Sequence, residues 1–379
     1  MHACLSITLR ILLSLSTMSA SSRTSMDEDV REFFGASSIL SFQTNLWTAD
    51  DTPSGQSILH HYQCHTIPRL GTDINNADTQ AGGSAIPPFI HFIWLGDKQL
   101  PLVVGNDDDD ENVCIRSWRH YHPHWMVQVW TDSDVLQEHH MTKWFNKEAL
   151  EYAIRHKNYG MASDILRLEL LFEHGGLYVD IDYLCVASVA DLHRQFDFYC
   201  GASNAGAIEL NNGLMASQPR HGVIQNMMER IRDWSMQVIR EQSLQQAAML
   251  HIAAFLDKDD TDKSRALLEH GIMALTPEQV IHHTGPGLLT STVAQILTTT
   301  TAWSSSVSSN CDLSRVAVLP YQVFHPLPNY RRRLGLETLN EELLEAHIVP
   351  GETKAVHLWQ CSWQEGPQGS VGRRPVDDS

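Results

Sequence analysis

The apolar positions between residues 161 and 172 follow a helical period. Methionine, isoleucine, leucine and phenylalanine stand at positions 161, 165, 168 and 172, which is the spacing of one face of an α-helix. Gly175 and Gly176 follow, and glycine commonly ends a helix because it adopts a left-handed backbone without steric cost. The pattern predicts a helix that ends at this glycine pair and leads directly into the next element.

Strict alternation of apolar and polar residues follows at positions 177–182. Aliphatic residues occupy the odd positions, and Tyr178, Asp180 and Asp182 occupy the even ones. Successive side chains of a β-strand point to opposite faces of the sheet. The alternation therefore predicts a strand with the phenol and both carboxylates on one face and the aliphatic side chains in the core.

Strand and helix patterns alternate along much of the chain from residue 86 onward. This alternation is typical of an α/β protein whose sheet is covered by helices. Ligands of such sheets bind beyond the carboxyl ends of the strands, where Trp94 and Asp182 are expected. The remaining patterns predict strands at 89–94 and 126–130, a helix between them, and two helices at 221–240 and about 243–256.

Composition narrows the class of protein only modestly. The chain has 379 residues, of which 42% are hydrophobic, so it can bury a sizeable core; we favour one large domain over two. A net charge of −18 argues against nonspecific nucleic-acid binding, and no polybasic tract suggests a membrane surface. The acidic run at 107–111 is expected to be a solvated loop.

The N-terminal segment leaves the localisation open. Within residues 1–21 the stretch at 5–15 is apolar but is interrupted by Arg10, and no run reaches the length of a spanning helix, so only a poor signal peptide is indicated. The absence of any Asn-x-Ser/Thr sequon weakly disfavours the secretory lumen. Seven cysteines without a Cys-x-x-Cys pair predict buried thiols, although one or two disulfides stay possible in a lumenal protein.

The two aspartates next to the predicted strand are the main chemical signal. Carboxylates one residue apart offer hard oxygen ligands to Mg²⁺ or Mn²⁺, and such ions usually bridge to substrate phosphates. Asp164 and Arg167 lie on one face of the preceding helix, away from its apolar stripe. They either form an i,i+3 pair of minor importance or take part in the same site.

These residues together resemble the sugar-binding region of glycosyltransferase family 32. The shared block is Ala-Ser-Asp164-x-x-Arg167 followed by Gly-Gly-x-Tyr178-x-Asp180-x-Asp182. The family includes fungal initiation-specific alpha-1,6-mannosyltransferases and inositol-phosphoceramide mannosyltransferases, and the large clostridial glucosylating toxins share the block. Further landmarks extend the resemblance over about residues 86–363; they lie at 86–94, 118–132, 284–287 and 357–363.

The resemblance implies a fold and a reaction. The fold would be a GT-A type nucleotide-diphospho-sugar transferase, with a mixed Rossmann-like sheet flanked by helices at 86–363. A partly disordered N-terminal extension at 1–85 and a disordered tail at 364–379 would flank it. The enzyme would use Mn²⁺ or Mg²⁺ to transfer a hexose, with retention, from a nucleotide-diphosphate sugar to a hydroxyl of a glycan, glycolipid or protein. Mannose is favoured over glucose, galactose and N-acetylglucosamine as the donor sugar.

The resemblance also assigns residues to roles. Asp182 would bind the metal directly and Asp180 through water or beside the ribose, with His357 as a further ligand. Asp164 and Arg167 would meet the sugar hydroxyls and the diphosphate. Tyr178 is expected on the same face of the strand as the two aspartates. Trp94 is equally a candidate for a core aromatic and for the platform on which the nucleobase stacks. The other expected substrate-binding residues are Ile93, Asn211 and Asn212, for which turn chemistry is an alternative, and the closing-loop residues Ser362 and Trp363.

Two other functions stay open at this stage. One is a toxin-like or effector glycosyltransferase that modifies a protein. The other is an inactive module that only binds sugar nucleotides, although the presence of all four polar residues of the block counts against it. Golgi localisation follows from the family, whereas the weak N-terminal signal suits the cytoplasm.

Overall fold

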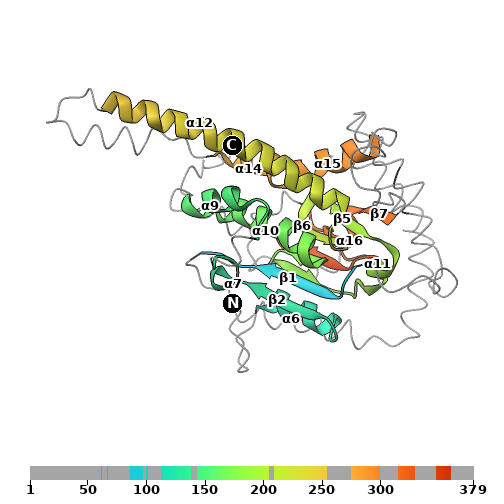
Figure 1. Ribbon diagram of the computed structural model, residues 1–379. Helices are drawn as coiled ribbons and strands as arrows, with labels where there is room; N and C mark the ends of the chain where they lie inside the picture. Colours follow the sequence, from blue (N-terminus) through green and yellow to red (C-terminus); the bar gives the residue numbers. More distant parts are fainter. Residues whose placement is uncertain are drawn as a thin grey trace, which may run out of the picture.

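The computed structural model describes residues 86–96, 100, 112–137, 143–204, 209–253, 275–298, 315–328 and 347–359, together with His61 and Thr66. The chain forms a central sheet with helices on both sides (Figure 1). The strands are β1 (Phe89–Ile93), β2 (Met126–Trp130), β3 (Gly176–Val179), β4 (Tyr183–Cys185), β5 (Phe198–Ala202), β6 (Leu210–Ser217), β7 (Val316–Leu319) and β8 (Ala355–His357). The helices are α6 (Val113–Tyr121), α7 (Asp132–Val135), α9 (Lys147–Arg155), α10 (Tyr159–His174), α11 (Ala190–Gln195), α12 (Gly222–Ala253), α14 (Pro277–His283), α15 (Pro286–Thr298) and α16 (Tyr321–Phe324).

The central sheet is mixed. Its strand order is β2-β1-β3-β6-β5-β7, and β4 and β8 form a separate two-stranded sheet. β1 runs parallel to β2 and to β3, whereas β6 runs antiparallel to both of its neighbours. The expected mixed α/β sheet flanked by helices is confirmed.

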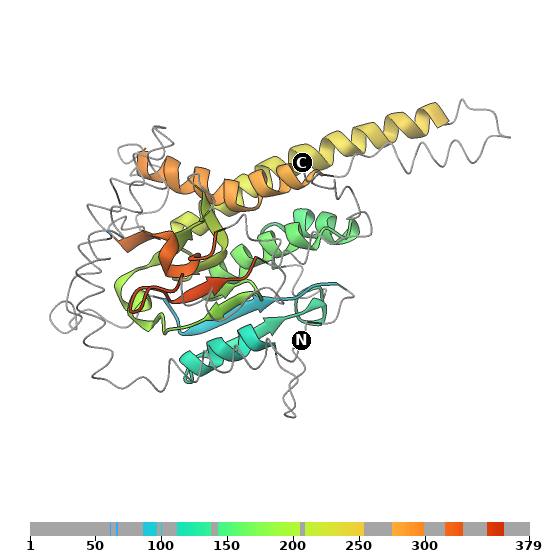
Figure 2. The ribbon, with the colours of Figure 1, turned by 180° about the vertical axis from the view of Figure 1, so that it is seen from behind.

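Each face of the central sheet carries its own core. One core packs α9, α10, α12 and α15 against one face, and the other packs α6, α11 and α16 against the opposite face. Figure 2 shows the two layers from behind. On β3, Tyr178 enters the first core, and Leu177 and Val179 enter the second. The expectation that only the aliphatic side chains of this strand are buried is wrong for Tyr178, because helices cover both faces.

Helix α10 begins and ends as the apolar spacing predicts. The Asn158 side chain accepts a hydrogen bond from the backbone N–H of Met161 at the first turn. Gly175 follows the last turn with φ at 65°, a value that residues other than glycine rarely adopt. A Cβ on Gly175 would also lie 2.6 Å from Cδ of Pro219. The helix is therefore fixed at both ends by residues readable in the sequence.

The strand after α10 is shorter than predicted. It ends at Val179, so Asp180 and Asp182 lie in a turn and not in a strand. Asp180 donates its backbone N–H to the carbonyl of Gly213 at 2.8 Å, and the chain then turns into β4. Pairing of β4 with β8 draws residues 183–185 out of the central sheet, and this tertiary contact overrides the local alternation.

The two helices predicted at 221–240 and 243–256 are a single helix. α12 runs through Gly222–Ala253. No glycine or proline lies inside it to break the helix, so the polar residues around position 242 continue it. Its far end projects beyond the other helices (Figure 1). None of the helices in the described ranges is both long and apolar enough to cross a membrane.

Several sequence predictions fall outside the described residues. They concern the N-terminal extension at 1–85 apart from His61 and Thr66, the acidic run at 107–111, the closing-loop residues Ser362 and Trp363, and the tail at 364–379. Among the described cysteines, Cys114, Cys185 and Cys200 are buried free thiols, as predicted.

Candidate functional site

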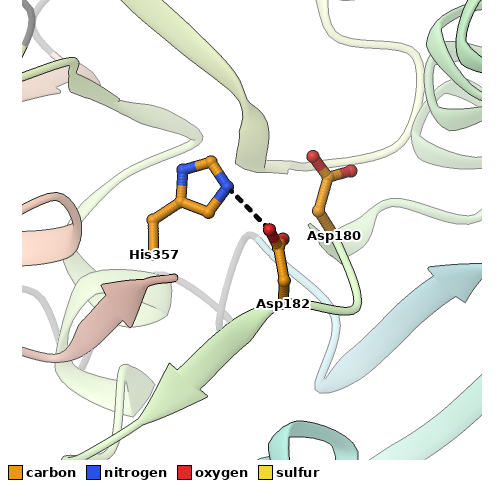
Figure 3. A group of neighbouring side chains, drawn as sticks. All are labelled: Asp180, Asp182 and His357. Atoms are coloured by element: carbon orange, nitrogen blue, oxygen red, sulfur yellow. Dashed lines mark ion pairs between the residues drawn. The ribbon is translucent and has the colours of Figure 1, made fainter. Parts of the chain in front are cut away.

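Asp180, Asp182 and His357 converge where the central sheet gives way to the two-stranded sheet (Figure 3). One ligand atom from each residue lies within 4.8 Å of the others. Nε2 of His357 lies 3.3 Å from Oδ2 of Asp182. The antiparallel register pairs Tyr183 with His357, and the Leu358 N–H donates to the Asp182 carbonyl at 3.0 Å. The β4–β8 ladder therefore holds the imidazole against the carboxylates.

Packing rather than hydrogen bonding orients the His357 ring. The Tyr183 ring stacks on it at 4.2 Å with an interplanar angle of 7°, and the Trp359 ring lies at 4.0 Å. Nδ1 of His357 is buried and has no hydrogen-bond partner among the described residues. Trp359 itself has φ at 54°, an unusual backbone for a bulky residue.

This donor set fits a divalent cation. Ligands side by side on an octahedral Mg²⁺ stand about 3 Å apart, given metal–oxygen distances of 2.0–2.1 Å. The separation of 3.3 Å between Asp182 and His357 is close to that value. Two carboxylates and one imidazole suit Mn²⁺ as well as Mg²⁺. The residues predicted from the sequence thus form a candidate metal site, and Asp182, His357 and Asp180 would hold the ion.

Asp180 is held by two side chains through one of its oxygens. Tyr178 donates its hydroxyl to Oδ1 at 2.5 Å, and Nη2 of Arg167 lies 3.4 Å from the same oxygen. The other oxygen, Oδ2, faces Gly213, where an added Cβ would lie only 2.6 Å away. Gly213 is a site residue that the sequence signals only as part of the Asn-Asn-Gly segment.

Arg167 is buried and uses its guanidinium mainly within the protein. Nη1 donates to the Asn212 carbonyl at 2.8 Å and Nε to the Ser163 carbonyl at 3.2 Å. Nη2 forms an ion pair with Asp164 at 3.1 Å, and the guanidinium carbon lies 4.4 Å from the centre of the Tyr178 ring. The i,i+3 pair foreseen as an alternative is present, and Arg167 links it to Asp180.

Asp164 is likewise enclosed by donors. Oδ1 accepts from Asn212 Nδ2 at 2.8 Å, and Oδ2 lies 3.0 Å from Thr284 Oγ1. Burial raises the pKa of Asp164, whereas Arg167 and the two hydrogen bonds lower it, with a net rise. Asp164, Arg167 and Asp180 thus form one buried network that borders the candidate metal site.

Asn211 and Asn212 lie at the start of β6 and not in a turn. Oδ1 of Asn211 accepts from the Tyr183 hydroxyl at 3.1 Å and from the Gly213 N–H at 2.8 Å, and its amide nitrogen donates to Ser203 Oγ. The side chain of Asn211 is therefore committed to the protein. Asn212 is committed through its nitrogen to Asp164.

The end of β1 lies beside this region of the sheet. The Ile93 side chain is part of the core, so only its backbone is available to a ligand. Trp94 is half-buried against the second core, and its backbone N–H donates to the Trp130 carbonyl at 2.9 Å. The next turn is fixed because the Gly96 N–H donates to Asp132 at 2.9 Å. The structure leaves the role of Trp94 as a nucleobase platform a prediction.

Part of this site lies in a region that known proteins share. Residues 108–199 match the family model "Glycosyltransferase sugar-binding region containing DXD motif". The chain is 30% identical to "Subversion of eukaryotic traffic protein A" of Legionella pneumophila, over 40% of this chain and 26% of that protein. It is 27% identical to "Uncharacterized glycosyltransferase L373" of Acanthamoeba polyphaga mimivirus, over 40% of this chain and 59% of that protein.

The matches to both relatives cover less than two thirds of their lengths. Among solved structures, "PaToxG Glycosyltransferase" is similar with a TM-score of 0.35 and 18% identity, over 55% of this chain and 69% of that one. The region matched by the family model contains Asp164, Arg167, Asp180 and Asp182. The sequence prediction that these residues belong to a sugar-binding region with a DXD motif is confirmed.

Proposed function

We propose, on the premise that this chain carries a glycosyltransferase domain, that the protein is a metal-dependent retaining hexosyltransferase. It transfers a sugar from a nucleotide-diphosphate donor to a hydroxyl group of an acceptor. The single observation that carries this proposal is the cluster of Asp180, Asp182 and His357, whose ligand atoms lie within 4.8 Å of one another. Two of its members lie in the matched sugar-binding region, and the third comes from a strand near the other end of the chain.

The proposed reaction exchanges one glycosidic bond for another. The acceptor hydroxyl oxygen bonds to the anomeric carbon as the bond from that carbon to the diphosphate oxygen breaks. The leaving diphosphate takes the acceptor proton, so no protein nucleophile is needed for attack from the same face. A bound divalent cation would supply positive charge that stabilises the leaving diphosphate.

The protein groups organise this site before the donor arrives. Asp182 and His357 would hold the cation, and Tyr178 and Arg167 fix the orientation of Asp180. Arg167 also places a permanent positive charge in a buried position, where electrostatic stabilisation is stronger than in water. Asn212 and Asp164 line the same network and would face the sugar hydroxyls.

The donor and the acceptor are the finer parts of the proposal. GDP-mannose is favoured by the resemblance to fungal mannosyltransferases, and UDP-hexoses are the other donors to test. The acceptor is a glycan, a glycolipid or a protein. The similarity to a Legionella protein whose name describes subversion of eukaryotic traffic supports a protein acceptor as a second candidate.

The proposal is tested with purified protein and a panel of GDP- and UDP-sugars. Mass spectrometry measures nucleotide release with Mn²⁺, with Mg²⁺ and with excess chelator, and nuclear magnetic resonance of the product gives the anomeric configuration. We expect release only with a divalent ion and a collapse in Asp182→Asn, which keeps the volume but removes a charged ligand. Asp233→Asn, on the exposed surface of α12, is the matched control.

Each outcome decides a separate part of the proposal. Full turnover in excess chelator would show that the reaction needs no metal. Inversion at the anomeric carbon would exclude the retaining mechanism. Binding of donor without turnover, across acceptors of all three classes, would favour the inactive sugar-nucleotide module.

A further inference from the structure

The junction between α14 and α15 reaches the buried network of Asp164 from a distant part of the sequence. α14 ends at His283 and α15 begins at Pro286, so Thr284 lies between them. Thr284 is completely buried, and its Oγ1 lies 3.0 Å from Oδ2 of Asp164, across 120 positions of sequence. Thr284 lies outside the region 108–199 that the family model matches, whereas Asp164 lies inside it.

The single hydroxyl proton of Thr284 has two acceptors within reach. Oγ1 lies 2.9 Å from the Val280 carbonyl as well as 3.0 Å from Asp164. The Val280 carbonyl already accepts the N–H groups of Thr284 at 2.9 Å and Gly285 at 3.1 Å. A carbonyl oxygen offers two lone pairs, so this one is already satisfied. The hydroxyl proton is therefore assigned to Asp164.

Three donors then hold the buried carboxylate of Asp164. They are the Thr284 hydroxyl, the Asn212 amide and the Arg167 guanidinium. A buried charge is tolerated only where it is paired and hydrogen-bonded. Removal of one donor leaves the carboxylate under-satisfied and free to rotate, which disturbs the positions of Asn212 and Arg167. Arg167 in turn contacts Asp180.

The α14–α15 junction leaves little space beside the carboxylate. A Cβ on Gly285 would lie 3.4 Å from Oδ2 of Asp164 and 3.1 Å from the backbone of Ile281. The distance to Asp164 is that of an ordinary contact, so an added side chain would crowd mainly the Ile281 backbone in α14. The buried network around Asp164 is therefore built by α10 and by the α14–α15 junction, which are far apart in the sequence.

We propose that Thr284 is a positioning residue of the donor site. Its hydroxyl fixes the Asp164 carboxylate, and through it the arrangement of Asn212 and Arg167 that receives the sugar diphosphate. The inference rests on the proposed function, because it assigns the α14–α15 junction to the site where the nucleotide sugar binds.

The test compares two changes at Thr284 with a matched change in α15. Thr284→Val keeps the shape and removes the hydroxyl, and Thr284→Ser restores it. Thr292 is also completely buried and its hydroxyl accepts from a charged group, Arg230, at 2.7 Å, so Thr292→Val is the control. Calorimetric titration with GDP-mannose and with UDP-glucose, each in the presence of Mn²⁺, gives the dissociation constants.

We expect Thr284→Val to weaken donor binding about tenfold or more, since a hydrogen bond to a buried charge is lost. Thr284→Ser should stay within about twofold of the wild type, and so should Thr292→Val. In a double-mutant cycle, Thr284→Val should add little further loss to Asp164→Asn, because the two act on one contact. Thr284→Ala replaces the valine variant if that variant does not fold.

The outcomes separate this inference from the proposed function. Donor binding that is unchanged in folded Thr284→Val overturns the inference and leaves the proposed function intact. A wild-type protein that binds neither nucleotide sugar contradicts both. Equal losses in Thr284→Val and Thr292→Val, or no rescue by serine, would reduce Thr284 to general support of the helix junction.

Discussion

The two aspartates of the Asp-x-Asp turn have different surroundings, and these set different roles. Asp182 is buried and meets the imidazole of His357 across 3.3 Å. Asp180 is more exposed and is turned by Tyr178 and Arg167, which both contact its Oδ1. Asp182 is therefore the candidate for a direct metal ligand, and Asp180 is a carboxylate whose orientation is fixed through Oδ1.

A change at His357 tests its place at the metal. We expect His357→Ala to weaken Mn²⁺ binding about tenfold or more, because removing a ligand or its support typically costs that much affinity. Calorimetric titration of Mn²⁺ with nucleotide diphosphate present gives the affinity. His120→Ala, on the exposed face of α6, serves as the control. Equal Mn²⁺ affinity in wild type and His357→Ala would remove His357 from the site.

Arg167→Lys tests whether the guanidinium shape matters beyond its charge. Three nitrogens of Arg167 make separate contacts, with two backbone carbonyls and two carboxylates. A lysine ammonium is a single point donor and cannot reproduce this set. We expect turnover to fall at least about tenfold while the fold is kept.

A second arginine provides the comparison for that experiment. Arg230 bonds Thr292 and Ser291 through two nitrogens, away from the Asp-x-Asp turn. Steady-state kinetics of Arg230→Lys should stay close to the wild type. Near-native kinetics in Arg167→Lys would show that Arg167 acts only as a charge on its helix.

At the scale of elements, β6 must approach the end of β3 without a side chain at Gly213. The Gly213 carbonyl accepts the Asp180 N–H at 2.8 Å, and a Cβ there would lie 2.6 Å from Oδ2 of the same aspartate. We expect Gly213→Ala to displace the Asp180 carboxylate. Nucleotide release should then fall at least about tenfold, with a cost in stability of about 1–3 kcal/mol for the overpacked site.

Two measurements are needed to interpret this variant. Nucleotide release reports the site, and urea unfolding reports the fold. Unchanged release and unchanged Mn²⁺ affinity in a folded Gly213→Ala protein would show that Asp180 has room to move without consequence.

The elements that the sequence predicts well are those with local determinants. Helix α10 has an apolar stripe, a capping Asn158 and a terminal Gly175. For β2, the short apolar run at 126–130 predicts the bounds that the structure has. The end of β3 could not be read in this way, because it depends on the pairing of β4 with a strand 170 residues later. The contact between Thr284 and Asp164 is hidden for the same reason.

The same distinction applies to the candidate site. The spacing of Asp164, Arg167, Asp180 and Asp182 and the family resemblance are enough to predict that these residues belong to one site. The partners that hold them do not, since Tyr183 and Gly213 contact the site through packing and close backbone approach. Sequence spacing indicates which groups do the chemistry, and tertiary structure indicates which groups orient them.

At the scale of the whole molecule, several buried histidines are kept neutral. Burial lowers the pKa of His91, His122 and His221 to about 4. The hydrogen bonds agree with this charge state: Nδ1 of His91 accepts from Trp130, and Nε2 of His122 accepts from the Val189 N–H. A protonated imidazole has no acceptor nitrogen.

These histidines make the fold sensitive to acid. Their folded pKa values lie below the unfolded value of about 6.5, so the unfolded chain binds more protons as the pH falls from about 6.5 to 4. Each then removes about 1.4 kcal/mol of stability per pH unit in that window. We expect the free energy of unfolding, measured in urea, to drop steeply as the pH falls from about 6.5 to about 4.

His221→Asn is the variant that tests this linkage. Nδ1 of His221 accepts the Val223 N–H at the start of α12, and asparagine is a good cap at such a position. The variant should therefore fold and lose one titrating group, so its stability should depend less steeply on pH. His120→Asn, on the surface, should leave the slope unchanged. An identical slope in both variants would contradict the linkage.

The β4–β8 ladder also has a consequence for how the protein is made. It joins Leu184 to Val356, so the nascent chain carries Asp180 and Asp182 out of the ribosome long before His357 exists. At about 5–20 residues per second, this interval lasts about 9–35 seconds. During that time Asp180 and Asp182 are present without the third residue of the candidate metal site. Ribosome-bound chains that stop short of residue 355 should therefore be unable to assemble the complete cation site, however well their central sheet has formed.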